Sequence, residues 1–435
     1  MNTHTQDSDF VHQLKTLSRE GKHDDIIRMV SPVWNNGATD PWTGYYYAVS
    51  LNRKGNTRKA YDIASSILHS HPDFEDIISP YLYSCYKVMI EPFREAGSSP
   101  DLAQLEETVQ RLLKISEQRP TEFFRTKSIL CLASIYIRHA EADKALEYLE
   151  LINPFTLDKE HYKFENQRHK EVVLQSDFEK FYGFKAKAYE MKKEWENCLL
   201  ICEEALKQGV TDIWIRRRLA LSKINTGKVQ EGLDELKELS RLKKEWYILI
   251  DIAETSYAAG KNDEALEYAV TGLMRGCGGS HDEFIVRGLS LVSQILRSVG
   301  KHENAALHDA YEVHVRLSKG MPVSDELSLS AASAGYPANE ECDITGLLRK
   351  LNSLWFNILG INDEIKAGAV SKIPDGKKYG FIKGEDGVDY FFLFSEFFDN
   401  PNRLKPGLKV MFQGRHGYDP VKKRKTIEAL KIKVL

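Results

Sequence analysis

One spacing recurs through most of the chain and limits what the chain can fold into. Gly21 and Gly55 are 34 residues apart. Gly227 and Gly260 are 33 residues apart, and Gly300 follows 40 residues later. Across the same part of the chain, from about residue 10 to residue 317, apolar residues return with the period of an α-helix. A fixed period of this length with helical patterning predicts stacked helix pairs, in which each pair packs on its neighbours.

The repeat around Ala48 shows the physical reason for the spacing. Ala48 and Ala60 are small enough to let the two helices of one hairpin cross closely. Gly55 lies between them, where the end of a helix often needs a positive φ. Pro72 follows the second helix, where its missing N–H costs nothing. Similar phrases occur at 133–145, 186–205, 220–236, 253–269 and 300–305. We expect about eight helical hairpins, either in two groups or as one continuous superhelix.

With a period near 34, segment 1–317 resembles the tetratricopeptide-repeat (TPR) family. The resemblance implies an all-α helical solenoid whose concave face holds an unidentified protein or peptide partner. The solenoid could be divided into two sub-arrays of repeats, 1–156 and 176–317. The junction between them would be the highly charged stretch 157–175, interpreted as a long solvated loop or an extended helix.

One basic cluster in the helical segment is a candidate partner-binding surface. Trp214, Arg217 and Arg218 together offer a basic patch with an aromatic edge. The alternative is a solvated helix face of a protein that is acidic in this region.

The last part of the chain, 366–435, has a different pattern. Tyr379 and Phe381 alternate along a strand-like run, so they are expected to share one face of a sheet. Phe391 and, with a small offset, Phe394 can join them from the next run. An exposed aromatic platform ringed by lysines is a usual device for stacking single-stranded bases. The alternative is that the rings are barrel core or bind protein, as we expect inward positions for Tyr390 and Phe392.

These runs resemble the nucleic-acid motifs of cold-shock domains. Lys377–Ile382 is similar to the family's Lys-Gly-Phe-Gly-Phe-Ile, and Tyr390–Phe394 is similar to its Val-Phe-Val-His-Phe. Gly407, Val410 and Phe412 match a later strand start. The resemblance implies a small all-β, five-stranded barrel of the OB type.

The same resemblance implies roles for single residues. Tyr379, Phe381, Phe391 and Phe394 would be the base-stacking residues, with Lys377 near phosphate. Lys378 and Tyr379 depart from the first motif, and two further departures matter most: Lys372 stands in place of a Trp, and Leu393 in place of a His. Lys372 remains a candidate nucleic-acid-binding residue.

Charge separates this module from the rest of the chain. Residues 366–435 hold 15 Lys and Arg against 8 Asp and Glu, a net charge of +7, whereas the remainder holds 45 against 55, a net charge of −10. Contact with a polyanion is therefore expected at the C-terminal module. Lys422, Lys423 and Arg424 form a basic run that either tracks phosphate or is a solvated hairpin tip.

Two segments connect the helical array to the barrel. Segment 318–342 is rich in small residues and turns and is predicted to be a linker. Segment 343–362 is predicted to be an amphipathic helix that docks the barrel or caps the array. A helix that binds a partner is the alternative.

The sequence offers little catalytic chemistry. Nucleophile elbows, zinc-ligand spacings and phosphate-binding loops do not rise above background, so we expect no enzyme, metal or cofactor. Cys198 and Cys202 could begin a metal site, but small-residue packing explains Cys198 better. Six cysteines without regular spacing and a polar N-terminus predict a reducing, cytoplasmic setting without a signal peptide or membrane span.

These features together give one hypothesis and its rival. The hypothesis is a non-catalytic adaptor that holds a protein partner in the solenoid and single-stranded RNA or DNA on the barrel. The rival is a protein-only scaffold, or a regulatory subunit of a nucleic-acid-processing or defence complex, in which the barrel binds protein.

Overall fold

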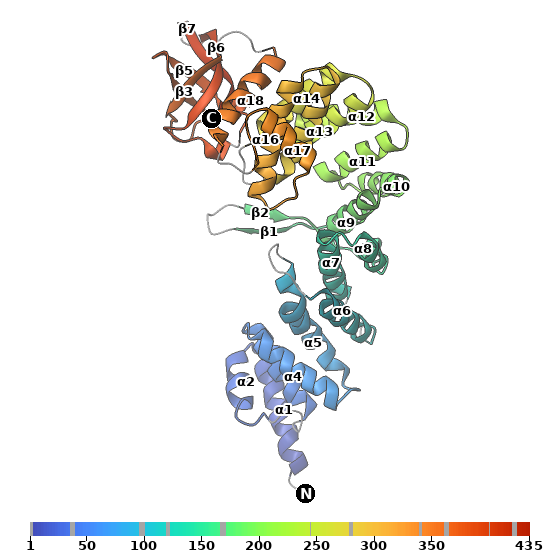
Figure 1. Cartoon of the computed structure of the whole chain (residues 1–435). Coiled ribbons are helices and arrows are strands. Elements are labelled where there is room, and N and C mark those ends of the chain that lie inside the picture. Colours follow the sequence, from blue (N-terminus) through green and yellow to red (C-terminus); the bar gives the residue numbers. More distant parts are fainter. Residues whose placement is uncertain are drawn as a thin grey trace. The chain divides into compact units, whose positions relative to one another are not determined.

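A computed structural model provides the fold of this chain. It describes residues 3–34, 40–94, 101–118, 122–165, 171–243, 245–277, 282–338, 342–360, 365–399, 401–419 and 424–435. The chain divides into an N-terminal unit, Met1–Ser222, and a C-terminal unit, Lys223–Leu435 (Figure 1). The N-terminal unit is mainly helical, and the C-terminal unit combines helices with a β-barrel.

The helices are α1 (Thr3–Arg19), α2 (His23–Val30), α3 (Pro41–Arg53), α4 (Thr57–Ser70), α5 (Ile78–Cys85), α6 (Leu102–Ser116), α7 (Glu122–Arg138), α8 (Ala142–Leu149), α9 (Asp177–Lys192), α10 (Trp195–Lys207), α11 (Ile213–Asn225), α12 (Val229–Leu242), α13 (Trp246–Ala258), α14 (Asn262–Gly276), α15 (Val286–Ser298), α16 (His302–Ser318), α17 (Asp325–Ser333) and α18 (Ile344–Ile358). The strands are β1 (Tyr162–Glu165), β2 (Glu171–Leu174), β3 (Ile365–Lys372), β4 (Tyr379–Gly384), β5 (Asp389–Leu393), β6 (Lys409–Asp419) and β7 (Arg424–Val434).

Among the described residues, α1 to α16 follow one another along the chain, and packed helix pairs such as α3–α4, α7–α8, α9–α10, α13–α14 and α15–α16 recur, as the repeat spacing predicts. The turns within pairs depend on left-handed residues. Gly55 has a φ of 80° and Gly260 has a φ of 74°. After the first of these, the N–H of Asn56 donates to the carbonyl of Leu51 at 2.9 Å, which closes the end of α3. Lys193 takes a similar positive φ of 58° at the α9–α10 turn.

Small residues let the paired helices approach. Ala48 on α3 and Ala60 on α4 are fully buried. A Cβ added to Gly44 would lie 2.6 Å from Cδ1 of Ile67 on α4, so a larger residue there would force the Ile67 side chain to shift. Cys198 on α10 is also fully buried, and its thiol donates to the carbonyl of Ala186 at 3.4 Å. These contacts fit the packing interpretation of Cys198.

The described residues of the charged stretch 157–175 include two short strands, so the predicted long loop or extended helix is wrong for them. β1 and β2 pair in antiparallel fashion, with Tyr162 opposite Leu174 and Glu165 opposite Glu171. The prediction was based on the many charged residues of this stretch and overlooked β-branched residues, such as Val172 and Val173, that favour a strand. Helix α9 packs directly against α7 and α8, so within the N-terminal unit helix packing continues past this hairpin.

The predicted linker contains a helix, α17. The side chain of Ser324 accepts a hydrogen bond from the N–H of Leu327 at 3.3 Å and so caps its first turn. Ala331 is fully buried, and α17 packs on α16. This helix was not predicted from the sequence, because it is short and its buried residue, Ala331, is small.

Helix α18 docks on the helical array. Its residues Leu347, Leu351 and Trp355 are fully buried. The indole N–H of Trp355 donates to Nε2 of His308 on α16 at 2.8 Å, while Nδ1 of that ring lies 2.8 Å from the carbonyl of Asn304. Burial lowers the pKa of His308 to about 4, so the ring is neutral and can accept the indole hydrogen bond.

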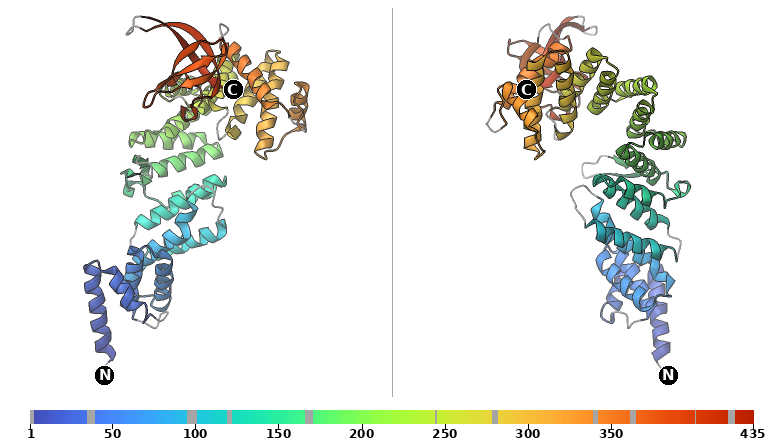
Figure 2. Two further views of the ribbon diagram at one scale, coloured as in Figure 1. Left: turned by 90° about the vertical axis from the view of Figure 1, so that its left-hand side faces the viewer. Right: turned by 45° about the vertical axis from the view of Figure 1, so that its right-hand side comes forward.

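The C-terminal strands form a closed five-stranded barrel in the order β3-β4-β5-β7-β6. All neighbouring pairs are antiparallel except β5 and β7, which are parallel. Figure 2 shows the strands wrapping around a common interior. The interior holds Val370, Ile382, Tyr390, Phe392, Val410, Phe412, Ala429 and Ile432. The predicted barrel and the inward positions of Tyr390 and Phe392 are confirmed.

The barrel joins the helices of its unit through β3, β6, β7 and the segment after β5. Met411, Ile365 and Phe398 belong to the helical core cluster or pack against it. Lys433 is buried, and its ammonium donates at 2.8 Å both to Asp399 and to the carbonyl of Cys277. A buried charge with two such partners is satisfied only in this docked arrangement.

Within the described part of the chain, no helix combines the length and the apolar character that a bilayer span requires.

Candidate nucleic-acid interface

Three aromatic rings gather on the outer face of β4 and β5. Phe381 lies directly opposite Phe391, and their ring centroids are 5.9 Å apart. Tyr379 lies 5.5 Å from Phe391 and 6.1 Å from Phe381 between centroids. Each of the three side chains is partly buried and partly exposed to solvent. We call these three residues the aromatic face.

Strand alternation explains why these rings point outward. Between them Gly380 and Ile382 on β4, and Tyr390 and Phe392 on β5, point into the barrel. A Cβ on Gly380 would lie 2.7 Å from Cε1 of Phe392. Glycine at this position therefore lets the core ring of Phe392 pack beneath the aromatic face.

The structure places Phe394 apart from the other three rings. β5 ends at Leu393, and Phe394 begins a 3₁₀ turn, Phe394–Glu396. Its ring stacks on the core ring of Phe392 at 6.1 Å and an interplanar angle of 23°. Leu393 takes the corresponding place on the outer face, opposite Tyr379, with 48% of its surface exposed. A strict count of alternate positions along β5 would have identified Leu393.

Lys372 lies beside the aromatic face because β3 carries a bulge. Val370 pairs with Ile382 inside the barrel, and Lys372 pairs with Phe381, so Ser371 is the extra residue. The hydroxyl of Ser371 donates to the carbonyl of Phe381 at 3.1 Å and holds the bulge in place. Simple alternation would put Lys372 inside the barrel, whereas the bulge turns it to the surface, where it is exposed.

Further lysines stand at the start of β4. Lys377 and Lys378 are exposed in the segment that leads into Tyr379. The N–H of Lys377 donates to the carbonyl of Pro374 at 3.2 Å, and the carbonyl of Lys378 accepts from the N–H of Phe394 at 3.0 Å. These backbone bonds fix the segment that carries the two exposed lysines at one end of the aromatic face.

The outer face also carries carboxylates. Asp389 lies opposite Lys383, with an N–O distance of 3.5 Å between their charged groups. Glu428 on β7 pairs with Phe391 in the parallel register. Across β6 and β7, Glu428 lies opposite Arg415 in the strand register, so charges of both signs stand near the rings.

The turn between β4 and β5 is fixed by a buried tyrosine. The hydroxyl of Tyr390 donates to Asp386 at 2.6 Å, and Lys366 lies 2.8 Å from the same carboxylate. Hydrogen bonds from Lys366, Tyr390 and the N–H of Val388 lower the pKa of Asp386 to about 2. The carboxylate thus stays charged and keeps the two strands of the aromatic face in register.

The basic run near the C-terminus lies mostly outside the described residues. Lys422 and Lys423 precede β7 and are not among them. Arg424 is the first residue of β7 and pairs with Asp419 through the backbone register, and only its backbone is described.

The predicted basic patch on α11 is largely internal. Arg217 and Arg218 are each only 8% exposed and lie 3.3 and 2.9 Å from the carboxylate of Glu190 on α9. Burial alone would raise the pKa of Glu190, but Arg218, Lys187 and Arg217 lower it to about 2. Trp214 is exposed, and the Arg218 guanidinium lies 6.0 Å from its ring centroid. These two arginines therefore form neither an open partner-binding patch nor a solvated helix face.

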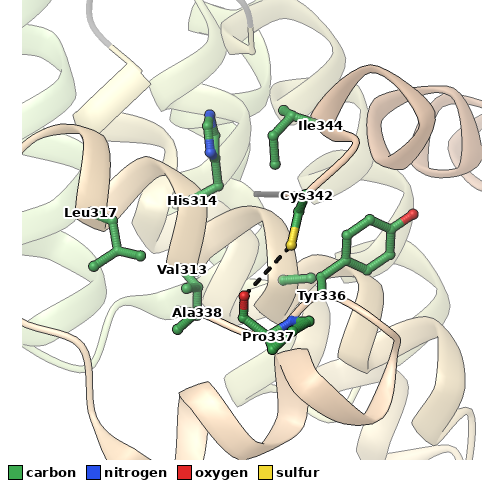
Figure 3. Close-up of a pocket in the computed structure, with 9 residues that line it drawn as sticks. Val313, His314, Leu317, Tyr336, Pro337, Ala338, Cys342 and Ile344 are labelled. Atoms are coloured by element: carbon green, nitrogen blue, oxygen red, sulfur yellow. Dashed lines mark hydrogen bonds between the residues drawn. The ribbon is translucent and has the colours of Figure 1, made fainter. Parts of the chain in front are cut away.

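Described residues of the C-terminal unit line at least two hollows among its helices. One, of about 580 Å³, is lined mainly by apolar residues of α16 and the segment before α18 (Figure 3). In it the thiol of Cys342 donates to the carbonyl of Pro337 at 3.5 Å. The second, of about 460 Å³, is lined by charged residues of α15 and α16, including Arg297, Glu312 and Arg316. Both hollows are large enough to take side chains of a peptide.

No family model matches the chain, and no curated protein matches its sequence. Solved structures match it at low similarity. A human IFIT1 dimer with PPP-AAAA is 14% identical, with 81% of this chain and 76% of that chain covered and a TM-score of 0.37. A tetratricopeptide repeat protein from Parabacteroides merdae is 12% identical, with 66% and 99% covered and a TM-score of 0.29. A STAND protein with a tetratricopeptide repeat sensor from Pyrococcus horikoshii is 13% identical, with 73% and 50% covered and a TM-score of 0.41. At these identities and TM-scores, the ligands of these proteins are not assigned to this chain.

Proposed function

We propose that this protein is a non-catalytic adaptor, whose barrel binds single-stranded RNA or DNA and whose helical repeats bind a protein partner. The observation that carries the first part is the aromatic face. Three neighbouring, partly exposed rings on one sheet surface offer a platform for successive bases.

Stacking on such a platform is expected to stabilise a bound single strand whatever its base sequence. Stacking of a base on an aromatic ring is worth about 1–3 kcal/mol, and every base has a π-face. Lys372, Lys377 and Lys378 add contacts to phosphate, which release counterions and make affinity fall with salt. The module that carries the rings has a net charge of +7, which favours a polyanion.

The cold-shock-like motifs support the same proposal. Tyr379 and Phe381 come from the segment similar to the first motif, and Phe391 comes from the segment similar to the second. β4 and β5 hold these segments side by side. Phe394 is left out of this platform, because it packs on the core ring of Phe392.

The protein partner is proposed for the helical repeats. The hollow lined by Arg297, Glu312 and Arg316 presents charges of both signs on α15 and α16. Ser290 donates to Glu312 at 2.6 Å, and Arg316 donates to the same carboxylate at 2.7 Å, so these side chains are preorganised. A peptide with both charged and apolar side chains would fit this surface and the apolar hollow on the same helix.

The test of nucleic-acid binding uses the full chain with Phe381→Ala and Phe391→Ala combined. Fluorescence anisotropy with a short labelled single-stranded oligonucleotide should show binding by the unmodified protein and a loss of at least about tenfold in the variant. Phe155→Ala removes another exposed ring, on the N-terminal unit, and should leave affinity unchanged. Equal affinity of the double variant and the unmodified protein would reject the proposal.

A protein-only scaffold is the second candidate, and the exposed apolar surface of Leu393 beside Tyr379 favours it. Co-purification separates the two candidates. Nucleic acid that absorbs at 260 nm and is removed by high salt supports the first, and a partner protein retained through the barrel without nucleic acid supports the second.

A further inference from the structure

Leu393 belongs to the outer surface that carries the aromatic face. It lies directly opposite Tyr379 in the register of β4 and β5, as Phe391 lies opposite Phe381. Leu393 is 48% exposed, whereas its strand neighbour Phe392 is almost completely buried in the barrel. An aliphatic side chain therefore stands beside the ring of Tyr379, on a strand about 4.8 Å away.

The lysines near the rings lie on the opposite side of Tyr379. Lys372 belongs to β3, and Lys377 and Lys378 belong to the segment between β3 and β4; all three are exposed. Leu393 belongs to β5, on the other side of β4. Because phosphate is attracted to the ammonium groups, a nucleotide stacked on Tyr379 turns its backbone toward β3 and the far edge of its base toward β5. That edge then lies over Leu393.

A leucine side chain can recognise only one kind of feature on a base edge. It neither donates nor accepts a hydrogen bond, so the amino and carbonyl groups of a base gain nothing from it. Its contribution is the removal of apolar surface from water. Of the bases of DNA and RNA, thymine carries an apolar group on this edge, the methyl group at C5, and apolar contact with that group is a usual way of reading thymine.

We propose that Leu393 contacts the C5-methyl group of a thymine stacked on Tyr379, and that the barrel thereby binds thymine-containing single-stranded DNA in preference to uracil-containing RNA. This inference rests on the proposed binding of single-stranded nucleic acid. Burial of one methyl group favours thymine about fourfold at this position. Stacking on the aromatic face holds any base, so Leu393 adds selectivity without being required for binding.

The experiment compares oligo(dT) with oligo(dU), because these strands have the same sugar and differ only in the C5-methyl group. Oligo(5-methyl-dC) and oligo(dC) form a second pair with the same difference, on a base that has an amino group at C4. The full chain is titrated with labelled strands of equal length by fluorescence anisotropy. The unmodified protein should bind the methylated strand of each pair at least about fourfold more tightly.

Three variants assign this preference to its side chain. Leu393→Ala removes the apolar contact at an exposed position and should lower both ratios to below about twofold, mainly by weakening the methylated strands. Leu393→Met is the matched control within the site, because its side chain is similar in size and also apolar, and it should keep both ratios. Leu329→Ala removes an exposed leucine from α17 and should keep them as well. Near-UV circular dichroism checks that each variant is folded.

Equal binding of the two strands within either pair by the unmodified protein would overturn the inference and leave the proposed function standing. A preference for the methyl group that survives in Leu393→Ala would do the same, because it would come from stacking on the rings alone. Binding of none of the four oligonucleotides would overturn the proposed function itself, and the inference with it.

Discussion

Phe381 and Phe391 face each other across β4 and β5 on the outside of the barrel, with ring centroids 5.9 Å apart. Directly beneath them, Phe392 and Tyr390 fill the interior and are almost completely buried. The same two strands thus supply both the core of the barrel and the surface proposed to bind nucleic acid.

This difference between the two faces predicts different effects on stability. Phe392→Ala should lower the free energy of unfolding of the C-terminal unit by about 3–5 kcal/mol, because it leaves a cavity. Phe381→Ala or Phe391→Ala should each cost only about 1 kcal/mol, since these rings are half-buried. Denaturant unfolding followed by circular dichroism measures all three. A cost for Phe381→Ala as large as that for Phe392→Ala would mean that the outer rings are structural.

The lysines beside the aromatic face predict that the affinity for an oligonucleotide depends on salt concentration. Lys372→Ala and Lys377→Ala should each weaken oligonucleotide binding and reduce the slope of log affinity against log salt by about 0.7. Lys163→Ala, on the β1–β2 hairpin, removes an exposed lysine from the N-terminal unit and should leave the slope unchanged. Titrations at several salt concentrations give the slopes. Unaltered slopes in both barrel variants would exclude phosphate contacts by these lysines.

The buried Trp355–His308 hydrogen bond predicts a pH effect on the C-terminal unit. The folded pKa of His308 is lowered from 6.5 to about 4 by burial, so the unfolded state takes up a proton more readily. Stability from this group is therefore complete above pH 6.5 and is lost as the pH falls through about 4. His308→Gln should flatten the dependence in that interval when unfolding is measured at a series of pH values. A dependence that is the same in the variant and the unmodified protein would assign the effect to other groups.

The same hydrogen bond predicts a cost for removing its donor. Trp355→Phe keeps most of the ring but leaves Nε2 of His308 buried without its partner. The free energy of unfolding should fall by about 1–3 kcal/mol. Leu329→Ala, at an exposed position on α17, is the control and should change stability little.

The buried cluster on α9 and α11 predicts acid sensitivity of the N-terminal unit. The pKa of Glu190 is about 2 in the folded state against an ordinary value of 4.5, because Arg218, Lys187 and Arg217 outweigh its burial. Its contribution is present above pH 4.5 and is lost as the pH falls through about 2. Glu190→Gln should destabilise the protein near neutral pH by about 3–5 kcal/mol, because it leaves two buried arginines without their carboxylate. The difference between the variant and the unmodified protein should shrink as the pH is lowered, and a constant difference would contradict this account.

The helical turns and the alternating rings could be predicted from the sequence because both depend on local rules. Gly55 and Gly260 occupy left-handed turns that few other residues tolerate. Tyr379 and Phe381 share a face because they are two positions apart in a strand.

Other features depend on contacts between distant residues and could not be predicted. Arg217 and Arg218 looked like surface charges because their partner, Glu190, lies on another helix. Lys372 was expected near the site from its place in the motif, but its exposure needs the bulge at Ser371. Phe394 leaves the outer face because β5 ends one residue before it.

Photo-cross-linking tests the central claim most directly. A short oligonucleotide that carries a photoreactive thio-substituted pyrimidine is bound to the full chain, irradiated and digested, and mass spectrometry locates the cross-linked residues. The account predicts cross-links at Tyr379, Phe381 or Phe391, which disappear in excess unlabelled oligonucleotide. Cross-links confined to the helical repeats, with these strands unmodified, would contradict it.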